Sequence, residues 1–298
     1  MKLTAPKIVD YALLTLLAAI WGSSFMLIKI AVETIPAIPM TTVRLVVAAV
    51  VMLVFALASG QKLPRGVKLW TLMAMAAIFG NALPFTLISW GEESVDSGLA
   101  AIMMAIMPLT TLFLAHIFTD DEKLNRWKFF GVMLGIVGLV VLIGPQKLFF
   151  LGHDVFRELA IASAAVCYGI STMVVRFIKG VPARAMTTGI LLTSALIMLP
   201  VSLVMVDFGD ISPSTASITA TVSLGILQTA IANLVAFFII QKLGATFFSQ
   251  LNFLVPLFGV LFGFVFLSEI PGVNALLALI IILTGVGVAR YGIYRSMR

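Results

Sequence analysis

Long apolar stretches alternate with short polar connectors along the whole chain. A helix needs about 20 consecutive apolar residues to cross a bilayer, and the pattern predicts ten such helices. Their approximate ranges are 11–31, 38–58, 69–90, 98–118, 127–144, 157–178, 186–206, 217–240, 246–267 and 273–293. The connectors are too short to fold as a separate domain. The pattern therefore predicts an all-α integral membrane protein and leaves no place for a soluble catalytic unit.

The composition agrees with a membrane protein. Hydrophobic residues make up 61% of the 298 residues and charged residues 11%, whereas soluble domains contain about 45–50% and about 25%. The net charge of +6 does not indicate a nucleic-acid partner, because the Lys and Arg residues lie between apolar runs and form no basic stripe with aromatic residues. We expect the lipid bilayer as a partner, and no nucleic acid.

The basic residues predict an orientation, because cytoplasmic loops and helix ends carry an excess of Lys and Arg. If the N-terminus is cytoplasmic, four of the 19 Lys and Arg residues fall on the other side and the remaining 15 face the cytoplasm. The four are Lys29, Arg44, Lys147 and Arg157. With an even number of spans, both termini are then expected in the cytoplasm.

Two proline-centred apolar stretches resemble each other at a distance of 148 residues. The first contains Pro108 and is followed by Glu122, and the second contains Pro256 and is followed by Glu269. Proline removes one helical hydrogen bond and kinks or loosens the helix. At matched places, Pro108 and Pro256 are candidates for hinge or gating elements. The alternative is a static kink, since proline is common in membrane helices.

A similar spacing recurs in other spans. The Trp-Gly-Ser-Ser run at 21–24 corresponds to the Tyr-Gly-Ile-Ser run at 168–171, and Asn81 corresponds to Gln228, each 147 residues later. The match predicts two repeats, residues 1–146 and 147–298. Each repeat holds five predicted spans, an odd number, so the second must cross the membrane in the opposite sense. Inverted repeats are usual in secondary transporters, which bind their substrates near the bilayer midplane.

Three motifs together resemble the EamA-type branch of the drug/metabolite transporter superfamily. They are the aromatic-Gly-x-Ser run that starts at Trp21, the run from Pro36 to Arg44, and the proline-centred helices that end in Glu. The resemblance covers the whole chain and implies a ten-helix carrier of the bacterial inner membrane that works by efflux or exchange. It also implies small metabolites as substrates, above all amino acids, including aromatic ones. The second half departs from the first at Leu191, which falls where Arg44 would recur, and at Tyr168, which replaces Trp.

Polar side chains at membrane depth normally face protein or a water-filled cavity, and aromatic and Met side chains suit an adaptable apolar pocket. We expect the substrate to be bound by Trp21, Ser24, Asn81, Phe85, Met104, Met107, Tyr168, Gln228 and Asn252. Asn81 and Gln228, a matched amide pair in opposite repeats, are the first candidates. The alternative is that the polar groups tie helices together and that the aromatic and Met side chains anchor at the interface or fill space.

All 13 Asp and Glu residues lie in predicted loops or near helix ends. We therefore expect no proton relay in the membrane interior. Efflux of lipophilic cations, which calls for an acid near the site, ranks below amino-acid export, and a passive channel is a further alternative.

Catalytic and metal-binding patterns are missing from the sequence, and the single cysteine, Cys167, lies in an apolar stretch. We expect no catalytic residue, no metal and no cofactor, and hence no enzymatic activity. The expected partners are a small-molecule substrate and the bilayer, and the chain is expected to function as a monomer.

Overall fold

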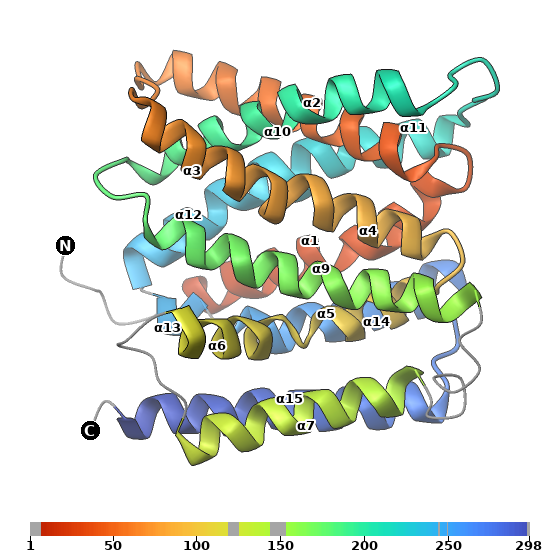
Figure 1. Ribbon diagram of the computed structural model, residues 1–298. Helices are drawn as coiled ribbons and strands as arrows, with labels where there is room; N and C mark the ends of the chain where they lie inside the picture. The colour runs from red at the N-terminus through yellow and green to blue at the C-terminus, as the bar shows by residue number, and fades with distance from the viewer. Residues whose placement is uncertain (1–6, 119–124, 144–152, 244, 249, 297–298) are drawn as a thin grey trace.

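Helices joined by short turns make up the described chain (Figure 1). The structure, a computed structural model, describes residues 7–118, 125–143, 153–243, 245–248 and 250–296, and no strand occurs among them. Eight helical stretches in these ranges are long and apolar enough to cross a membrane. The other two predicted crossings fall on α7 (Arg126–Ile143), of 18 residues, and on the apolar helix α14 (Leu251–Leu267), of 17 residues. The predicted all-α membrane fold is confirmed.

Some spans consist of several helical segments. The segments of the first half are α1 (Ile8–Val32), α2 (Ala37–Ala58), α3 (Val67–Ala77), η1 (Ile78–Ala82), α4 (Leu83–Glu92), α5 (Ser97–Met104), α6 (Met107–Phe118) and α7. Those of the second half are α9 (His153–Arg176), α10 (Ala183–Met205), α11 (Thr215–Ser223), η2 (Leu224–Ile231), α12 (Ala232–Leu243), α13 (Ala245–Phe248), α14 and α15 (Val273–Ser296). The third span of each half contains a π-helical segment, η1 or η2, between two α-helices.

Proline precedes the second span of each half. Pro36 stands directly before α2 with φ −55°, and Pro182 stands directly before α10 with φ −56°. Proline has no N–H to leave unpaired, and its fixed φ suits the first residues of a helix. The two second spans therefore begin at equivalent places for the same physical reason.

The helices pack in the pairs that a twofold relation between the halves requires. Helix α1 contacts α14 and the α11–η2–α12 span, and its counterpart α9 contacts the α5–α6 and α3–η1–α4 spans. Helix α2 pairs with α10, and α7 pairs with α15, each with its own counterpart. Figure 1 shows α7 and α15 together at one edge of the bundle and α2 and α10 towards the opposite edge. All these contacts join the first half to the second, so the halves are interleaved.

Two ion pairs repeat this relation with their charges exchanged. Near the start of α1, Asp10 Oδ1 accepts a hydrogen bond of 2.7 Å from Lys242 Nζ, near the end of α12. Near the start of α9, Arg157 pairs with Glu93, which directly follows α4. Asp10 and Arg157 are separated by 147 positions, and Glu93 and Lys242 by 149. Each pair joins the start of a first span to the end of a third span from the other half.

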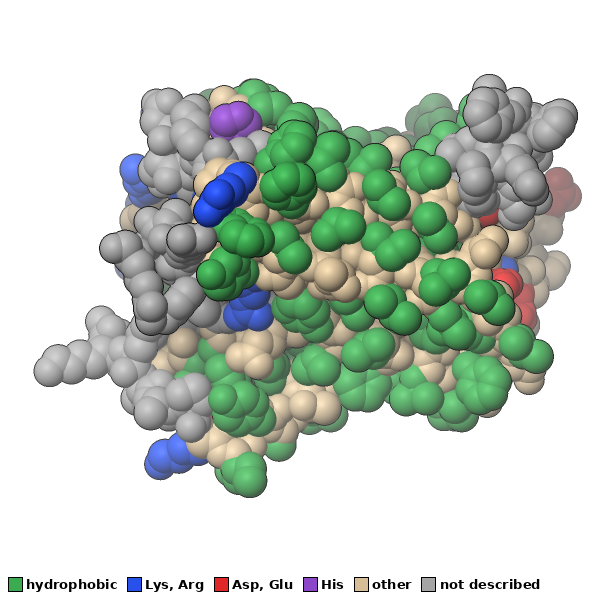
Figure 2. Space-filling view, turned by 90° about the horizontal axis from the view of Figure 1, so that it is seen from below, with side chains coloured by type: hydrophobic (Ala, Val, Ile, Leu, Met, Phe, Trp, Pro, Cys, Tyr) green, Lys and Arg blue, Asp and Glu red, His purple; other side chains and the backbone are tan. Residues whose placement is uncertain are grey.

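The face formed around α7 and α15 is apolar in its middle. Both helices expose large hydrophobic side chains, among them Phe129, Ile136, Leu276 and Ile280. Figure 2 shows hydrophobic side chains across the centre of this view, with most of the visible Lys and Arg at one end and the visible Asp and Glu at the other. A belt of this kind is what contact with lipid tails requires.

Candidate functional site

The two matched amides lie in π-helical segments. Asn81 belongs to η1 and Gln228 to η2. In η1 the N–H of Leu83 bonds to the carbonyl of Ile78, five residues back, instead of four. Such wider turns are rare in proteins overall, but where they do occur they often lie at functional sites. The sequence predicts the amide pair, but the π turns that hold both amides are a finding of the structure.

Gln228 is bound by the first span of the other half. Its side chain is 3% exposed, and its Nε2 donates to Ser23 Oγ at 3.3 Å. Its backbone carbonyl accepts from Trp21 Nε1 at 3.1 Å, and Ser223 Oγ donates to its Oε1 at 3.3 Å. The structure thus brings the predicted residues Trp21 and Gln228 together. The serine that meets them is Ser23; Ser24, the predicted one, is buried one position further along α1.

Asn81 also crosses to the other half. Its Nδ2 donates to Ser194 Oγ of α10 at 2.9 Å. The neighbouring Gly80 leaves space for Ser171 of α9, because a Cβ at that position would lie 2.5 Å from Ser171 Oγ. Asn81 is partly exposed. Each amide therefore contacts a serine of the other half, Gln228 on the first span and Asn81 on the second span of that half, and their binding of substrate stays a prediction.

Arg44 is the residue that the list of candidates missed. It lies inside α2 and is 5% exposed. Its Nε donates to Thr229 Oγ1, next to Gln228, at 3.0 Å, and its guanidinium carbon lies 3.8 Å from the centre of the Phe85 ring. Tyr168 packs against the hydrophobic cluster that contains Phe85. A charged residue inside an apolar span is rare and usually functional, so the run from Pro36 to Arg44 contained the signal.

The fourth span is interrupted where a kinked helix was expected. Helix α5 ends at Met104 and α6 begins at Met107, with a turn between them. Pro108 is therefore the second residue of α6, a position where proline leaves no hydrogen bond unmade. The expectation of a continuous helix centred on Pro108 is wrong for this reason. Met104 and Met107 flank the break and are both partly buried.

The ninth span is interrupted at a different place. A turn at Gln250 separates α13 from α14, and Pro256 lies buried inside α14. Asn252 is the second residue of α14 and is partly exposed. The two prolines occupy matched positions in the sequence, but only Pro108 stands next to a break. Their hinge role stays a prediction.

Glu269 joins the fourth span to the ninth. Its carboxylate accepts from Ser97 N and Ser97 Oγ at 2.8 Å each and from Gly98 N at 2.9 Å. These donors form the start of α5, where a helix favours a negative charge. Helix α5 packs closely on α14, and a Cβ on Gly259 would lie 2.3 Å from the Cβ of Ala101. Helix α6 instead packs against α9. Helix α5, the N-terminal segment of the fourth span, is thus packed against the ninth span, and its hydrogen bonds to Glu269 hold it there. We call this set of hydrogen bonds the Glu269 latch.

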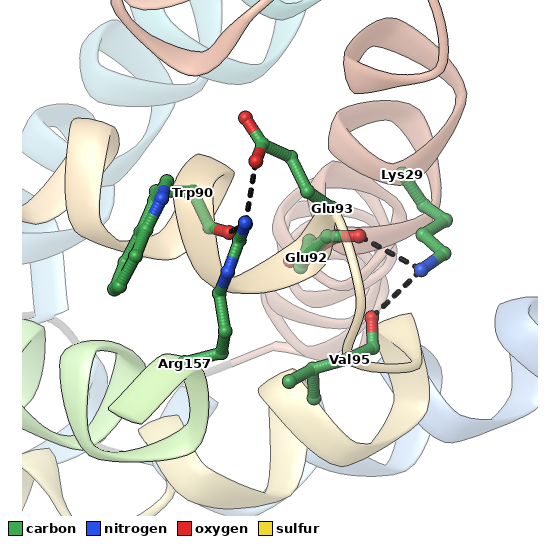
Figure 3. Close-up of polar contacts among 6 residues, drawn as sticks. All are labelled: Lys29, Trp90, Glu92, Glu93, Val95 and Arg157. Atoms are coloured by element: carbon green, nitrogen blue, oxygen red, sulfur yellow. Dashed lines mark hydrogen bonds and ion pairs between the residues drawn. The ribbon is translucent and has the colours of Figure 1, made fainter. Parts of the chain in front are cut away.

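Cations hold the end of α4 (Figure 3). Lys29 Nζ donates to the backbone carbonyls of Glu92 at 2.8 Å and Val95 at 3.0 Å. Arg157 donates to the carbonyl of Trp90 and pairs with Glu93. Helix ends leave carbonyls unpaired, and positive side chains satisfy them. The two cations, from α1 and α9, fix this end of the third span.

Glu92 is buried, although an acid near a helix end is expected to be exposed to water. Its side chain is 0% exposed, and neither carboxylate oxygen has a hydrogen-bond partner in the described part of the chain. Lys29 and Arg44 act on it electrostatically. The acids do lie near helix ends, but this one is enclosed by helices from both halves.

The known family of this chain follows from its match along both halves. A model of the EamA-like transporter family fits residues 10–144 and fits again at residues 156–291. The chain belongs to the EamA-like transporter family. It is a membrane transporter built from two copies of one unit, and the resemblance inferred from its motifs is confirmed.

Curated relatives of this EamA-like chain include transporters from several bacteria. The uncharacterized transporter YoaV of Bacillus subtilis is 24% identical over 271 residues, which cover 90% of this chain and 91% of YoaV. A protein of Streptantibioticus cattleyicolor named "Probable terminal-alkyne amino-acid exporter" is 26% identical over 266 residues, 87% of this chain and 85% of that protein. The uncharacterized inner membrane transporter YedA of Escherichia coli is 32% identical over 124 residues, 41% of this chain and 40% of YedA.

A solved crystal structure shares the fold. It superposes with a TM-score of 0.66 at 20% sequence identity and covers 95% of this chain and 98% of the other. At this identity the likeness concerns the fold alone.

Proposed function

We propose that this EamA-like transporter exports small amphipathic metabolites by alternating access, with amino acids, including aromatic ones, as its first substrates. The observation that carries the proposal is the meeting of polar and aromatic groups from both halves, Gln228 with Ser23 and Arg44 with Thr229 and Phe85. A site shared by inverted repeats can open to either side when one half rocks against the other. The name of the Streptantibioticus relative supports amino acids as a substrate class.

The proposal includes a location and an orientation. The transporter lies in the bacterial inner membrane as a monomer, with both termini in the cytoplasm and repeats at 1–146 and 147–298. The distribution of Lys and Arg supports this orientation, and α1 begins and α15 ends at the same end of the bundle in Figure 1. The two ranges matched by the family model, 10–144 and 156–291, support the division.

Efflux of lipophilic cations is a weaker candidate. Recognition of a cation calls for a carboxylate at the site. Glu92, the acid that acts electrostatically on Arg44, is buried and is itself acted on by two cations, Lys29 and Arg44. A buried positive charge at the meeting of the halves disfavours a cationic substrate.

Counterflow tests the function. Purified protein in liposomes loaded with an unlabelled amino acid is expected to take up the same labelled amino acid in a saturable manner, with phenylalanine, tryptophan and leucine as the first panel. Tetraphenylphosphonium tests the cation alternative. Counterflow and saturation exclude a channel. The proposal is wrong if no amino acid moves faster than into protein-free vesicles, or if only the cation moves.

The same assay tests the amide pair. Asn81→Ala and Gln228→Ala are each expected to raise KM or lower the rate by about tenfold, since loss of one hydrogen bond to substrate costs about 1.4 kcal/mol. Thr219→Ala is the matched control, because Thr219 is exposed on α11 in the same span as Gln228. Wild-type kinetics in both amide variants would remove the pair from the site.

A further inference from the structure

Arg44 is a charge at membrane depth that requires a physical reason. It lies seven residues after the start of α2, or about 10 Å along the helix at 1.5 Å per residue. Burying a cation in this way is unfavourable unless the charge is paired or has a function. Its counterpart in the second half is Leu191, so the twofold relation of the fold does not require an arginine here.

Two side chains contact the guanidinium of Arg44: Thr229 bonds to its Nε edge, and Phe85 packs on one face. Thr229 Oγ1 donates to the carbonyl of Leu224 at 2.8 Å, which leaves a lone pair of the hydroxyl to accept from Arg44 Nε at 3.0 Å. The Phe85 ring, 3.8 Å from the guanidinium carbon, covers one face. The π turn of η2 carries both Thr229 and its acceptor Leu224. The edge with the two Nη groups is not used by these contacts.

The Nη groups of Arg44 have no hydrogen-bonded carboxylate in the described part of the chain. Within these described residues no ion pair joins them to a carboxylate either, although Glu92 acts on Arg44 electrostatically. Thr229 is neutral, and a ring face gives a modest attraction of about 0.5–2 kcal/mol. A buried guanidinium with an unused pair of parallel donors fits a carboxylate, which it binds through two N–H···O bonds.

We propose that Arg44 binds the carboxylate of the transported solute through its two Nη groups and thereby selects carboxylate-bearing amphipathic solutes over cations and neutral analogues. The inference rests on the proposed function and specifies its substrate class. Phe85 lies against the charge, and Tyr168 packs on the hydrophobic cluster that contains Phe85, so that the apolar part of the solute can pack there. Because Leu191 replaces the second arginine, the site holds one anion anchor and binds the solute in a single orientation.

The test uses binding as well as transport. Phenylacetate is expected to raise the melting temperature of the purified wild-type protein, whereas phenylacetamide, of nearly the same shape without the charge, is not. Arg44→Gln is expected to abolish the phenylacetate effect. In counterflow, Arg44→Lys is expected to raise KM for a transported amino acid roughly 10- to 100-fold, because an ammonium cannot make the paired bonds. Arg65→Gln, at an exposed position, is the control.

The outcomes separate this inference from the proposed function. If no amino acid is transported but phenylacetate stabilises the wild type and not the Arg44 variants, export of amino acids fails and the carboxylate site stands. Equal stabilisation by the acid and the amide, stabilisation by neither, or an unchanged effect in Arg44→Gln overturns the site. If Arg44→Gln does not fold, Arg44→Lys keeps the charge and decides the question, since a wild-type KM and unchanged phenylacetate binding in that variant contradict a paired contact.

Discussion

At the scale of single residues, Lys29 and Glu92 form the most unusual pair of neighbours. The ammonium gives two hydrogen bonds to backbone carbonyls at the end of α4, while the enclosed carboxylate receives none in the described structure. Lys29 thus serves two purposes, as the donor for the helix end and as a cation that acts on Glu92.

We predict that Lys29→Met lowers stability by about 1.5–3 kcal/mol through the lost charged hydrogen bonds, with a further loss because Glu92 is left without this cation. In an E92Q background the further loss should vanish, so Lys29→Met should be less harmful there than in the wild type. Thermal unfolding of the four proteins in detergent measures the difference. Lys62→Met, in an exposed position, is the control, and equal effects in both backgrounds would contradict the coupling.

The sequence predicts the positions of these residues along their spans, but not which other helices bury them. Hydropathy places Glu92 at the end of a span, and a helix end in sequence is expected to meet water. Its enclosure results from α1, α2 and α9, which pack against α4 from elsewhere in the chain. Arg44 was overlooked as a candidate for a similar reason: its position in an apolar span is visible in the sequence, but its contacts with Thr229 and Phe85 depend on how the halves interleave.

At the scale of elements, the hydropathy pattern predicts the spans and misses their internal breaks. Apolar length determines which segments can cross a bilayer, and this signal is strong in all ten stretches. The turn before Pro108 and the π turns at Asn81 and Gln228 lack a comparable signal, since Ala105 and Ile106 are ordinary helix residues and π turns arise from tertiary contacts. Breaks of these kinds divide the third, fourth, eighth and ninth membrane crossings into shorter helical segments, and we predict that these segments can shift separately.

The Glu269 latch makes such a shift measurable. Glu269→Gln keeps the size of the side chain but removes the negative charge that meets three donors at the start of α5. We predict that this variant loosens α5 from α14. Ile102 is buried and lines a pocket together with Val260 of α14 and Glu269. In a Cys167→Ala background, a cysteine at Ile102 should then react faster with a membrane-impermeant maleimide.

Asp96→Asn is the matched control for the latch. Asp96 immediately precedes α5 but makes no capping hydrogen bond to it, so removing its charge should leave the labelling rate of the cysteine unchanged. If Glu269→Gln labels no faster than this control, the carboxylate does not hold the contact closed.

At the scale of the whole molecule, the inverted repeat explains why ion pairs with exchanged charges occur at the two ends of the bundle. Asp10 with Lys242 and Arg157 with Glu93 join equivalent helices. Each pair consists of one acid and one base, so the exchange of charge sign keeps each interaction and leaves the net charge of each end unchanged. The excess of Lys and Arg that the positive-inside rule predicts on one face must therefore come from residues outside these two pairs.

Because the repeats are inverted, equivalent loops of the two halves are expected on opposite faces of the membrane, and labelling from each side can test this. Ser94 follows α4 in the first half, and Lys242 closes α12 at nearly the equivalent place in the second half. With both termini in the cytoplasm, we predict that Ser94→Cys in the Cys167→Ala background reacts with an impermeant maleimide added to intact spheroplasts, whereas Lys242→Cys reacts only in inside-out vesicles. Labelling of Ser94→Cys and Lys242→Cys from the same side would contradict the inversion. If Ser94→Cys reacts only in inside-out vesicles and Lys242→Cys reacts in spheroplasts, the inversion holds and the orientation is the reverse of the one predicted. Lys62→Cys, expected on the cytoplasmic side within the first half, should follow Lys242→Cys, because orientation depends on the membrane face and not on the repeat to which a loop belongs.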